Sequence, residues 1–566
     1  MADRLRATPR WLLLLGTLAL GFYLVNALHY GQLPLRIEEN EWPPMAQAIY
    51  ETGKPVIAAE DSHRIRYTED LRVDQEPFIG AWHPPLYLYT LGASMVVLGE
   101  DASFSLRAIG VAALLISALL LLLIAREVTP RWRIVGGVAA ALLLIHPYAI
   151  QGSLFLDVDT TIYAPAILLL LWLAIRFSKR QAALRPVDVL ALGAAFALVT
   201  WTKMTTTVPV LCVLVVWWLL TRQQTRRAVV EAASFVLTGA ALFFSTYALW
   251  CRLTDVPFSY TFDITFGDKS DRLFASWDVV ELSAHWHVRW FGGAILVLTA
   301  VYLVDLALNY IRERHLRPLD LPFLVGLGIL ANYVLVSPSS GYYQGKYAFP
   351  ALAMLLLPIV WMLLRDSQPH VRATRWLAAA GIALAAALLL PDLLTNLGVG
   401  GNYGSNVFDL RVIAAAGATL WLVWRLGGSR GFAGGVVVAL IAFSVVQADR
   451  SYDSNHSPLY PVPDTNDFRA ATADLNRTRQ PGQIVVAPKD MGFYIPGPII
   501  EGEDGIYRGD ARLAAAIQRY PEISAFAFDS FGPPVGPATA EVLDRCFRER
   551  RSYGTASVAY RDRSCD

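Results

Sequence analysis

The sequence predicts a polytopic α-helical membrane protein of about 13 transmembrane helices, with interfacial helices in its first outer loop and a small C-terminal α/β domain outside the membrane. Hydrophobic residues make up 55% of the 566 and charged residues 17%, which is too apolar for a soluble globular protein. Apolar segments of about 17 to 25 residues, long enough to cross a hydrocarbon core, recur up to residue 447. Beyond residue 448 the chain becomes polar, Pro-rich and charged.

The first predicted span follows a basic stretch that contains Arg4, Arg6 and Arg10. No small-residue cleavage site follows residues 11–30, and the apolar run is long enough to cross, so we expect a retained helix rather than a signal peptide. The predicted spans are residues 11–30, 104–125, 134–152, 160–176, 187–202, 205–221, 228–251, 290–311, 320–337, 347–364, 376–391, 412–424 and 431–447.

Basic residues fall on alternate loops of this series. The loops at 126–133, 176–185, 222–227, 312–317, 365–375 and 425–430 are rich in Arg and Lys, whereas the opposite loops hold chiefly Lys203, Lys269, Arg272 and Lys346. The positive-inside rule then places the N-terminus in the cytoplasm of a plasma (inner) membrane protein. This orientation requires that residues 86–98 do not span, and they are too few to do so. We therefore expect residues 84–98 to form a helix in the outer interface.

The sequence thus predicts a membrane domain over residues 1–448, with a first outer loop at 31–103, and an extracytoplasmic α/β domain over 449–566. In the second domain we expect helices at 464–476, 511–520 and 539–548, and buried strands at 484–487 and 524–528. Cys546 and Cys565 can form a disulfide if this end faces an oxidising compartment. The net charge of +1 and the lack of a basic domain or motif exclude nucleic acid as an expected partner.

Two groups of polar residues on the predicted outer face could carry chemistry. Glu38 and Glu39 stand just beyond the first span, at the start of a helical apolar pattern, and a carboxylate at a low-dielectric boundary suits a general base. His83 precedes a Pro-Pro step that breaks one helix and begins the next. A solvated loop for the two glutamates and a structural role for the histidine are the alternatives.

The second group combines carboxylates and lysines at the outer ends of spans. Asp157 and Asp159 form an Asp-x-Asp pair that can bind a divalent cation or substrate, while Asp159 can instead cap the next helix. Lys203 and Lys346 adjoin outer span ends, where they can hold an anionic lipid phosphate or simply snorkel. Whether a metal ion takes part is left open by the sequence.

The order and spacing of these motifs resemble the GT-C class of integral-membrane glycosyltransferases. Glu38-Glu39 matches the Asp-Glu of the bacterial branch that includes the lipid A aminoarabinose and rhizobial lipopolysaccharide transferases. His83-Pro84-Pro85-Leu86 is similar to its Lys-Pro-Pro-Leu and to the His-Pro-Pro-Leu of protein O-mannosyltransferases. Further similarities are Trp42, Gly53, Gly99 with Ser105-Leu106-Arg107, Leu156-Asp157, Thr202-Lys203 and Gly345-Lys346-Tyr347 through Pro350.

The resemblance implies a transferase that moves a sugar from a polyprenyl-phosphate donor to an envelope acceptor (lipid, glycan or protein) with inversion at the outer membrane face. Glu38 or Glu39 would be the catalytic base. The substrate-binding residues would be His83, Asp157, Asp159, Lys203, Lys346 and Tyr347. Glu38 stands where the family usually has Asp, and His83 where the nearest branch has Lys.

Two other classes of protein compete with this hypothesis. A transporter or lipid flippase calls for charges near mid-membrane and for broken, inverted repeats, and the sequence offers mainly Asp305. A non-catalytic glycan-binding envelope protein would depend on residues 455–566 and not on Glu38 and Glu39.

Overall fold

The computed structural model describes residues 9–31, 39, 42–58, 65–67, 73–75, 77–99, 103–180, 183–222, 224–267, 291, 293–335, 345–365, 465–488, 495, 497–501, 509–529, 535–554 and 556–562. The chain divides into two compact units. The first contains Met1–Gln32, Trp82–Tyr87 and Arg107–Pro461, and the second contains Leu33–Ala81, Leu88–Leu106 and Val462–Asp566. The domain boundary predicted after residue 448 lies outside the described residues and stays a prediction.

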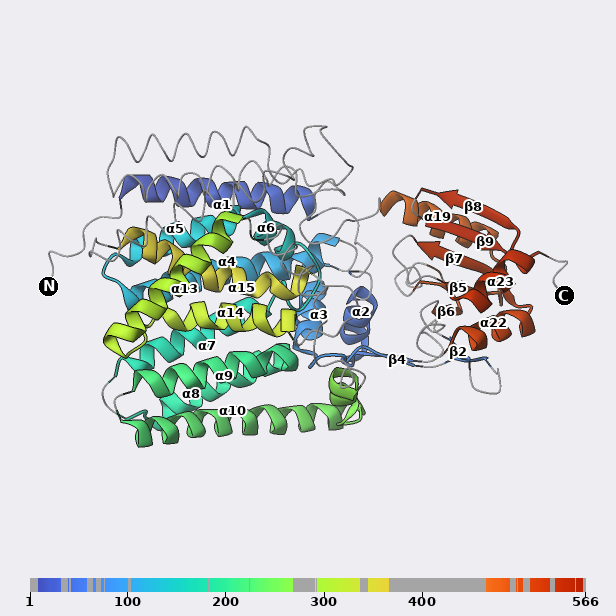
Figure 1. The fold of residues 1–566 in the computed structure, drawn as a ribbon. Coiled ribbons are helices and arrows are strands. Elements are labelled where there is room, and N and C mark those ends of the chain that lie inside the picture. The colour runs from blue at the N-terminus through green and yellow to red at the C-terminus, as the bar shows by residue number, and fades with distance from the viewer. Residues whose placement is uncertain are drawn as a thin grey trace. The chain divides into compact units, whose positions relative to one another are not determined.

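The first unit is a bundle of helices that lie side by side (Figure 1). Helix α8 packs along α7 and α10, α14 packs along α9 and α15, and α1 packs along α5. The helices are α1 (Arg10–Tyr30), α4 (Ser103–Val128), α5 (Trp132–Ile145), α6 (Pro147–Ser153), α7 (Tyr163–Ser178), α8 (Pro186–Thr202), α9 (Met204–Thr221), α10 (Thr225–Thr254), α11 (Tyr260–Phe262), α13 (Gly293–Glu313), α14 (Asp320–Leu335) and α15 (Gly345–Leu364).

Five helices in the described part of the chain are long and apolar enough to cross a membrane, or six if one bent pair is a single span. The five are Arg10–Tyr30, Phe104–Val128, Met204–Thr221, Thr225–Thr254 and Lys346–Leu364. Shorter apolar helices occupy the predicted spans at 160–176, 187–202 and 320–337. The spans predicted at 376–391, 412–424 and 431–447 lie outside the described residues, so the predicted total of about 13 is not confirmed.

The bent pair differs from the single helix expected at 134–152. Helices α5 and α6 meet at an angle of 66°. His146 between them is extended, with φ −69° and ψ 127°, and Pro147 begins α6. Proline lacks an N–H and its ring clashes with the carbonyl four residues earlier, which kinks or breaks a helix. Here the extended backbone of His146 makes the step a break.

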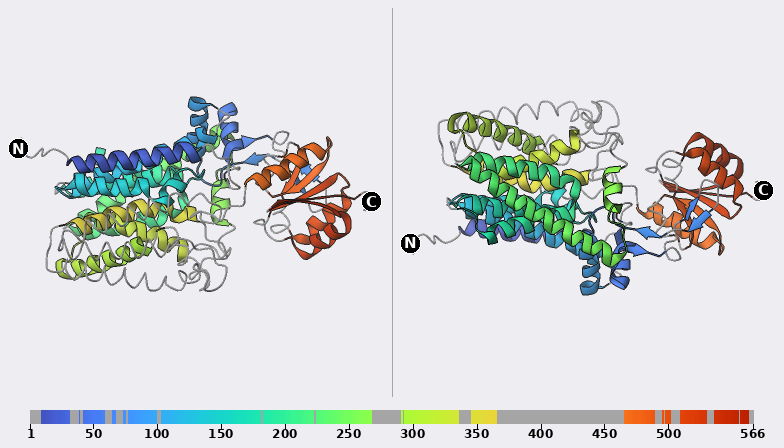
Figure 2. Two further views of the ribbon diagram at one scale, coloured as in Figure 1. Left: turned by 90° about the horizontal axis from the view of Figure 1, so that it is seen from above. Right: turned by 90° about the horizontal axis from the view of Figure 1, so that it is seen from below.

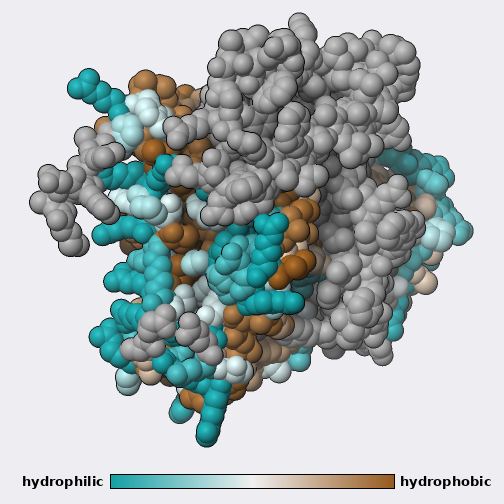
Figure 3. Space-filling view, turned by 60° about the vertical axis from the view of Figure 1, so that its left-hand side comes forward, coloured by the Kyte–Doolittle hydropathy of each residue, from teal (hydrophilic) through white to brown (hydrophobic). Residues whose placement is uncertain are grey.

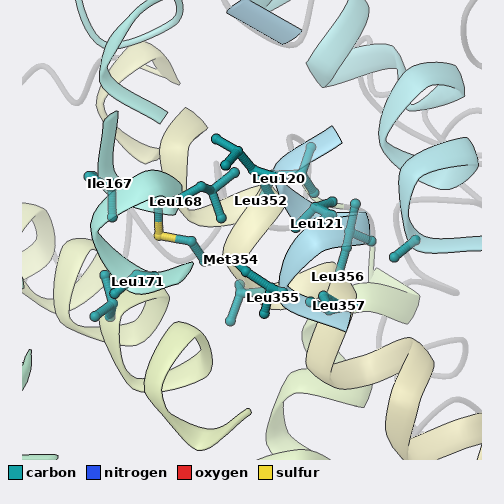
Figure 4. Close-up of a cluster of buried hydrophobic side chains, with 14 of the residues drawn as sticks. Leu120, Leu121, Ile167, Leu168, Leu171, Leu352, Met354, Leu355, Leu356 and Leu357 are labelled. Carbon is teal, nitrogen blue, oxygen red and sulfur yellow. The ribbon is translucent and has the colours of Figure 1, made fainter. Parts of the chain in front are cut away.

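The core of the helical unit is built from leucine-rich faces of several helices. Figure 4 shows side chains of α4, α7 and α15 that meet in one buried cluster. The labelled residues are Leu120, Leu121, Ile167, Leu168, Leu171, Leu352, Met354, Leu355, Leu356 and Leu357. Close packing of these side chains fixes where the ends of α7 and α15 lie, and both ends matter for the site described below.

Cations gather at one end of the helices, where Lys179 after α7 pairs with Glu127 in α4 at 3.0 Å. Hydrophilic side chains cover part of the face that Figure 3 shows, next to apolar ones. Exposed basic residues in these helix ends and their loops are Arg126, Arg131, Arg176, Lys179, Arg185, Arg226, Arg312 and Arg314. Each of the predicted basic loops that the structure describes, at 126–133, 176–185, 222–227 and 312–317, thus exposes at least one basic side chain.

Asp305, the carboxylate on which the transporter alternative depends, lies within α13 and belongs to an ion-pair network with Arg317, just before α14, and Arg365, just after α15. Arg317 Nη1 donates to Asp305 Oδ2 at 2.7 Å, and Arg365 pairs with the other carboxylate oxygen. Arg317 also pairs with the fully buried Asp320 at 3.1 Å. Asp305 is therefore neutralised by two arginines.

The Arg317→Met variant is expected to lose about 3 kcal/mol of stability, because breaking a buried ion pair leaves uncompensated charge. Thermal unfolding of the purified protein in detergent checks this. Arg226→Met, which removes an exposed arginine, is the control and should unfold like the wild type. Equal midpoints for the two variants would contradict the prediction.

The described residues of the first outer loop form two helices and two small antiparallel sheets, and they belong to the second unit except for Trp82–Tyr87. Helix α2 (Trp42–Thr52) ends at Gly53, whose φ of +75° suits glycine, and Tyr89 Oη donates to the Gly53 carbonyl at 2.9 Å. Strand β1 (Val56–Ile57) pairs with β4 (Phe78–Ile79), and β2 (Ile65–Tyr67) with β3 (Val73–Gln75). Helix α3 (Leu86–Leu98) forms where the non-spanning helix was predicted, and it exposes Val96, Val97 and Leu98.

The C-terminal residues of this unit form a five-stranded sheet in the order β6-β5-β7-β9-β8, with helices on both faces (Figure 2). Strands β5, β6 and β7 are parallel, and β9 pairs antiparallel with β7 and β8. Helix α19 packs on one face, and α22 and α23 pack on the other. The bounds are α19 Thr465–Thr478, β5 Ile484–Ala487, β6 Ile499–Glu501, α22 Asp510–Arg519, β7 Ile523–Asp529, α23 Pro537–Cys546, β8 Glu549–Tyr553 and β9 Ala556–Tyr560. All five elements predicted here form, within two residues of their predicted ends.

Cys546 is disulfide-bonded, whereas Cys212 and Cys251 are free thiols. Cys565, the remaining cysteine of the four, lies outside the described residues. A disulfide is typical of an oxidising compartment.

Asp474 joins α19 to the two antiparallel strands. Its carboxylate accepts hydrogen bonds from the hydroxyls of Tyr553 (2.5 Å) and Tyr560 (2.7 Å), and from Arg551 at 2.9 Å. Burial alone would raise the pKa of Asp474, but these donors outweigh it and lower the pKa to about 2.

The Asp474→Asn variant is expected to destabilise the C-terminal sheet by about 1–2 kcal/mol at neutral pH. Because the folded pKa lies below the unfolded value, this stabilisation is present above about pH 4 and disappears as the pH falls towards 2. Proteolysis of the full protein in urea measures it across that range. Asp544→Asn, at a carboxylate whose side chain is 75% exposed, is the control; a wild-type advantage that persists at pH 2 would contradict the prediction.

Candidate functional site

The Asp157–Asp159 turn lies between α6 and α7. Asp157 Oδ1 accepts a hydrogen bond from the Asp159 backbone N–H at 2.9 Å, and Thr161 Oγ1 donates to the Asp157 carbonyl at 2.6 Å. These local bonds hold the turn in one shape. Helix α7 begins after Ile162, which is its N-cap residue. The alternative in which Asp159 caps this helix is therefore wrong.

Two lysines bring opposite charge to this turn. Lys203 lies in the extended junction between α8 and α9, and its Nζ donates to Asp159 Oδ2. Lys346 lies in the first turn of α15, and its Nζ is 2.9 Å from Asp157 Oδ2. The side chains of the first pair are 3% and 1% exposed, and those of the second 12% and 4%. We call Asp157, Asp159, Lys203 and Lys346 the charge quartet.

Tyr347 completes the arrangement. The Lys203 ammonium is 4.4 Å from the centre of its ring and the Lys346 ammonium 5.5 Å. An aromatic face attracts cations, so Tyr347 stabilises both ammonium groups where they are. The structure thus brings together five of the eight site residues predicted from the sequence. They come from three separate stretches: the turn between α6 and α7, the junction between α8 and α9, and the start of α15.

The two carboxylates are in different electrostatic environments. Burial raises the pKa of Asp159 to about 6, although Lys203 opposes the shift. Burial acts on Asp157 too, but the attraction of Lys346 and then Lys203 outweighs it and lowers its pKa. Asp159 Oδ1 is buried and has no hydrogen-bond partner among the residues that the structure describes. This oxygen is suited to accept a hydrogen bond from a bound hydroxyl.

A divalent cation fits this site poorly. Each carboxylate is already matched by an ammonium group. Within the described ranges, no group of three or more His, Cys, Asp or Glu side chains could hold a metal ion. A cation at Asp157 and Asp159 stays a prediction, and no step below depends on one.

The three remaining predicted site residues are His83, Glu38 and Glu39. His83 is half-buried. The carbonyl of its neighbour Trp82 accepts a hydrogen bond at 3.0 Å from Oγ1 of Thr265, which lies in a π-helical turn after α11. Glu39 belongs to the second unit and is fully buried, and Glu38 lies outside the described residues. The catalytic role of the glutamates and the substrate role of His83 remain predictions.

Sequence reasoning did not find the buried contacts that support the quartet. Tyr23 Oη lies 2.9 Å from Ser153 Oγ at the end of α6. A Cβ at Gly110 would lie 1.8 Å from the Ser153 carbonyl oxygen. Helices α4 and α6 are therefore so close here that only glycine fits at position 110. The His146-Pro147 step was the available signal that a helix breaks here.

Comparisons with known proteins show what this chain is similar to. Residues 82–250 match the family model described as "Dolichyl-phosphate-mannose-protein mannosyltransferase". The fold is that of the GT-C glycosyltransferases, so the resemblance predicted from the sequence is confirmed. No curated protein sequence matches the chain.

Two solved structures have a fold similar to that of this chain. ArnT from Cupriavidus metallidurans bound to undecaprenyl phosphate is 15% identical, with a TM-score of 0.57 over 99% of each chain. The apo oligosaccharyltransferase of Archaeoglobus fulgidus is 11% identical, with a TM-score of 0.51 over 92% of this chain and 70% of that one. At these identities the likeness is one of fold.

Proposed function

We propose that this protein is a glycosyltransferase that moves a sugar from a polyprenyl-phosphate donor to a cell-envelope acceptor. The observation that carries the proposal is the charge quartet, a buried set of paired charges in a fold like that of an undecaprenyl-phosphate-bound ArnT. Buried charges at membrane helix ends are expensive and usually functional.

In the proposed reaction an acceptor hydroxyl oxygen attacks the anomeric carbon of the donor sugar. The bond from that carbon to the phosphate oxygen breaks, and the polyprenyl phosphate leaves with the electron pair. Glu38 or Glu39 takes the proton of the hydroxyl. Lys203 and Lys346 offset the charge that grows on the phosphate, and Asp157 and Asp159 orient the two ammonium groups. Attack opposite the leaving group inverts the anomeric centre.

We place the site and the C-terminal sheet on the extracytoplasmic side of the inner membrane. The Cys546 disulfide supports this location for the C-terminal residues. The exposed arginines at the other end of the helices support a cytoplasmic position for that end. The network around Asp305 gives no support to a transport path, since both of its oxygens are held by arginines.

The test is transfer of radiolabelled sugar from a panel of polyprenyl-phosphate donors in membranes that carry the wild type or Glu38→Gln/Glu39→Gln. Transfer by the wild type and its loss in the double variant would support both the activity and the base. Glu51→Gln, at an exposed carboxylate on α2, is the control and should remain active. If the wild type turns over no donor that a control transferase uses, the proposal fails.

A further inference from the structure

We propose that His146 is a positioning residue that sets the Asp157–Lys346 half of the charge quartet for the polyprenyl-phosphate donor. The inference rests on the proposed function and adds to it a residue outside the quartet. His146 is 4% exposed and lies at the break between α5 and α6. A histidine at a proline-induced break is costly to bury unless both ring nitrogens are used.

Both nitrogens have partners, and these fix the tautomer. The Tyr148 backbone N–H donates to Nδ1 at 3.2 Å, so Nδ1 carries no proton. The proton is then on Nε2, which donates to the Phe291 carbonyl at 3.3 Å. His146 therefore caps the first turn of α6 and ties it to the chain just before α13.

Helix α6 is buried and is held by contacts at both of its ends. All seven of its residues are buried. The Tyr148 ring meets the ring of Phe291 edge-on at 5.4 Å, and Ser153 at the far end is bonded to Tyr23. A short helix held at both ends moves as one body, because close-packed interiors do not yield locally.

Both members of one ion pair depend on α6. Asp157 follows Ser153, the last residue of α6, by four positions. On the other side, Tyr148 packs edge-on against Phe349 at 5.5 Å, and a Cβ at Gly152 would lie 2.1 Å from that ring. Phe349 stands one turn after Lys346 on α15. A displaced α6 would therefore shift Asp157 and Lys346 relative to each other.

The experiment measures donor and acceptor kinetics of the purified full-length protein at equal amounts of folded enzyme. His146→Ala removes the cap and the link to Phe291, and should raise KM for the polyprenyl-phosphate donor about fivefold, a fold-change that corresponds to about 1 kcal/mol of lost donor binding. The acceptor KM should stay within about twofold. His146→Asn supplies another capping oxygen to Tyr148 N–H and should recover at least half of the loss on a logarithmic scale.

Ser117→Ala is the matched control, since it removes one buried side-chain bond, to the Ala113 carbonyl in α4 at 2.8 Å. It should keep the wild-type donor KM. A wild-type donor KM in His146→Ala would overturn the proposal, as would an equal rise in the acceptor KM or an Asn variant no better than Ala. The wild-type rate in the same assay tests the proposed function separately, so the two failures are distinguishable.

Discussion

Lys203→Met is expected to lower kcat/KM for the donor by at least about 100-fold. Removing one group that stabilises charge in a transition state typically lowers kcat about 10²- to 10³-fold, which corresponds to about 2.7–4 kcal/mol. The variant leaves Asp159 at 1% exposure with no cation on its Oδ2. It also removes one of the two charges proposed to face the leaving phosphate. Transfer kinetics with a polyprenyl-phosphate sugar measure the effect.

Two further variants separate a catalytic loss from a loss of folding. Lys179→Met breaks a pair whose side chains are 41% and 24% exposed, and it should keep nearly full activity. The double variant Lys203→Met/Asp159→Asn removes both charges and should recover thermal stability while activity stays low. Recovery of activity along with stability would show that this pair is structural only.

The second large effect is expected from Gly110→Ala. The new methyl group would lie 1.8 Å from a backbone oxygen at Ser153, which cannot rotate away as a side chain could. Overpacking of this kind typically costs about 1–3 kcal/mol, and here it would also push the end of α6 and the Asp157 turn away from α4. We expect a lower unfolding temperature together with reduced transfer.

Gly21→Ala on α1 is the matched control, because nothing lies within 4 Å of a Cβ built at Gly21. That variant should be as stable as the wild type or slightly more so, since alanine favours the helix over glycine. A Gly110→Ala protein with wild-type stability and activity would contradict the close approach of α4 and α6.

The sequence predicts regular elements well where a pattern repeats. Helix α8 forms at Pro186–Thr202 against a predicted 187–202, because an apolar run of that length has one stable conformation in a membrane. Asp157, Lys203 and Lys346 could be grouped because charges at outer span ends share one membrane face. Their pairing could not be predicted, since it depends on how α7, α8 and α15 pack.

The bend between α5 and α6 and the short strands β1 to β4 are harder to predict from the sequence. Residues 134–152 form one apolar run, and this pattern predicts a single span although the His146-Pro147 step signals a break. Contacts with Phe291 and Phe349 hold the bent arrangement. The strands β1 to β4 have two or three residues each, too short to show an alternating pattern.

The Lys203 junction has a consequence for membrane thickness. Helix α8 has 17 residues before the junction, and at about 1.5 Å per residue it measures about 26 Å, less than the roughly 30 Å of a typical hydrocarbon core. An α8 that begins at the inner boundary therefore ends a few ångströms below the outer lipid headgroups. The bilayer must thin at this point, or the donor phosphate must sink to meet the lysine. Transfer should then be slower in reconstituted bilayers of lipids with longer acyl chains, so the transfer rate depends on the thickness of the surrounding bilayer.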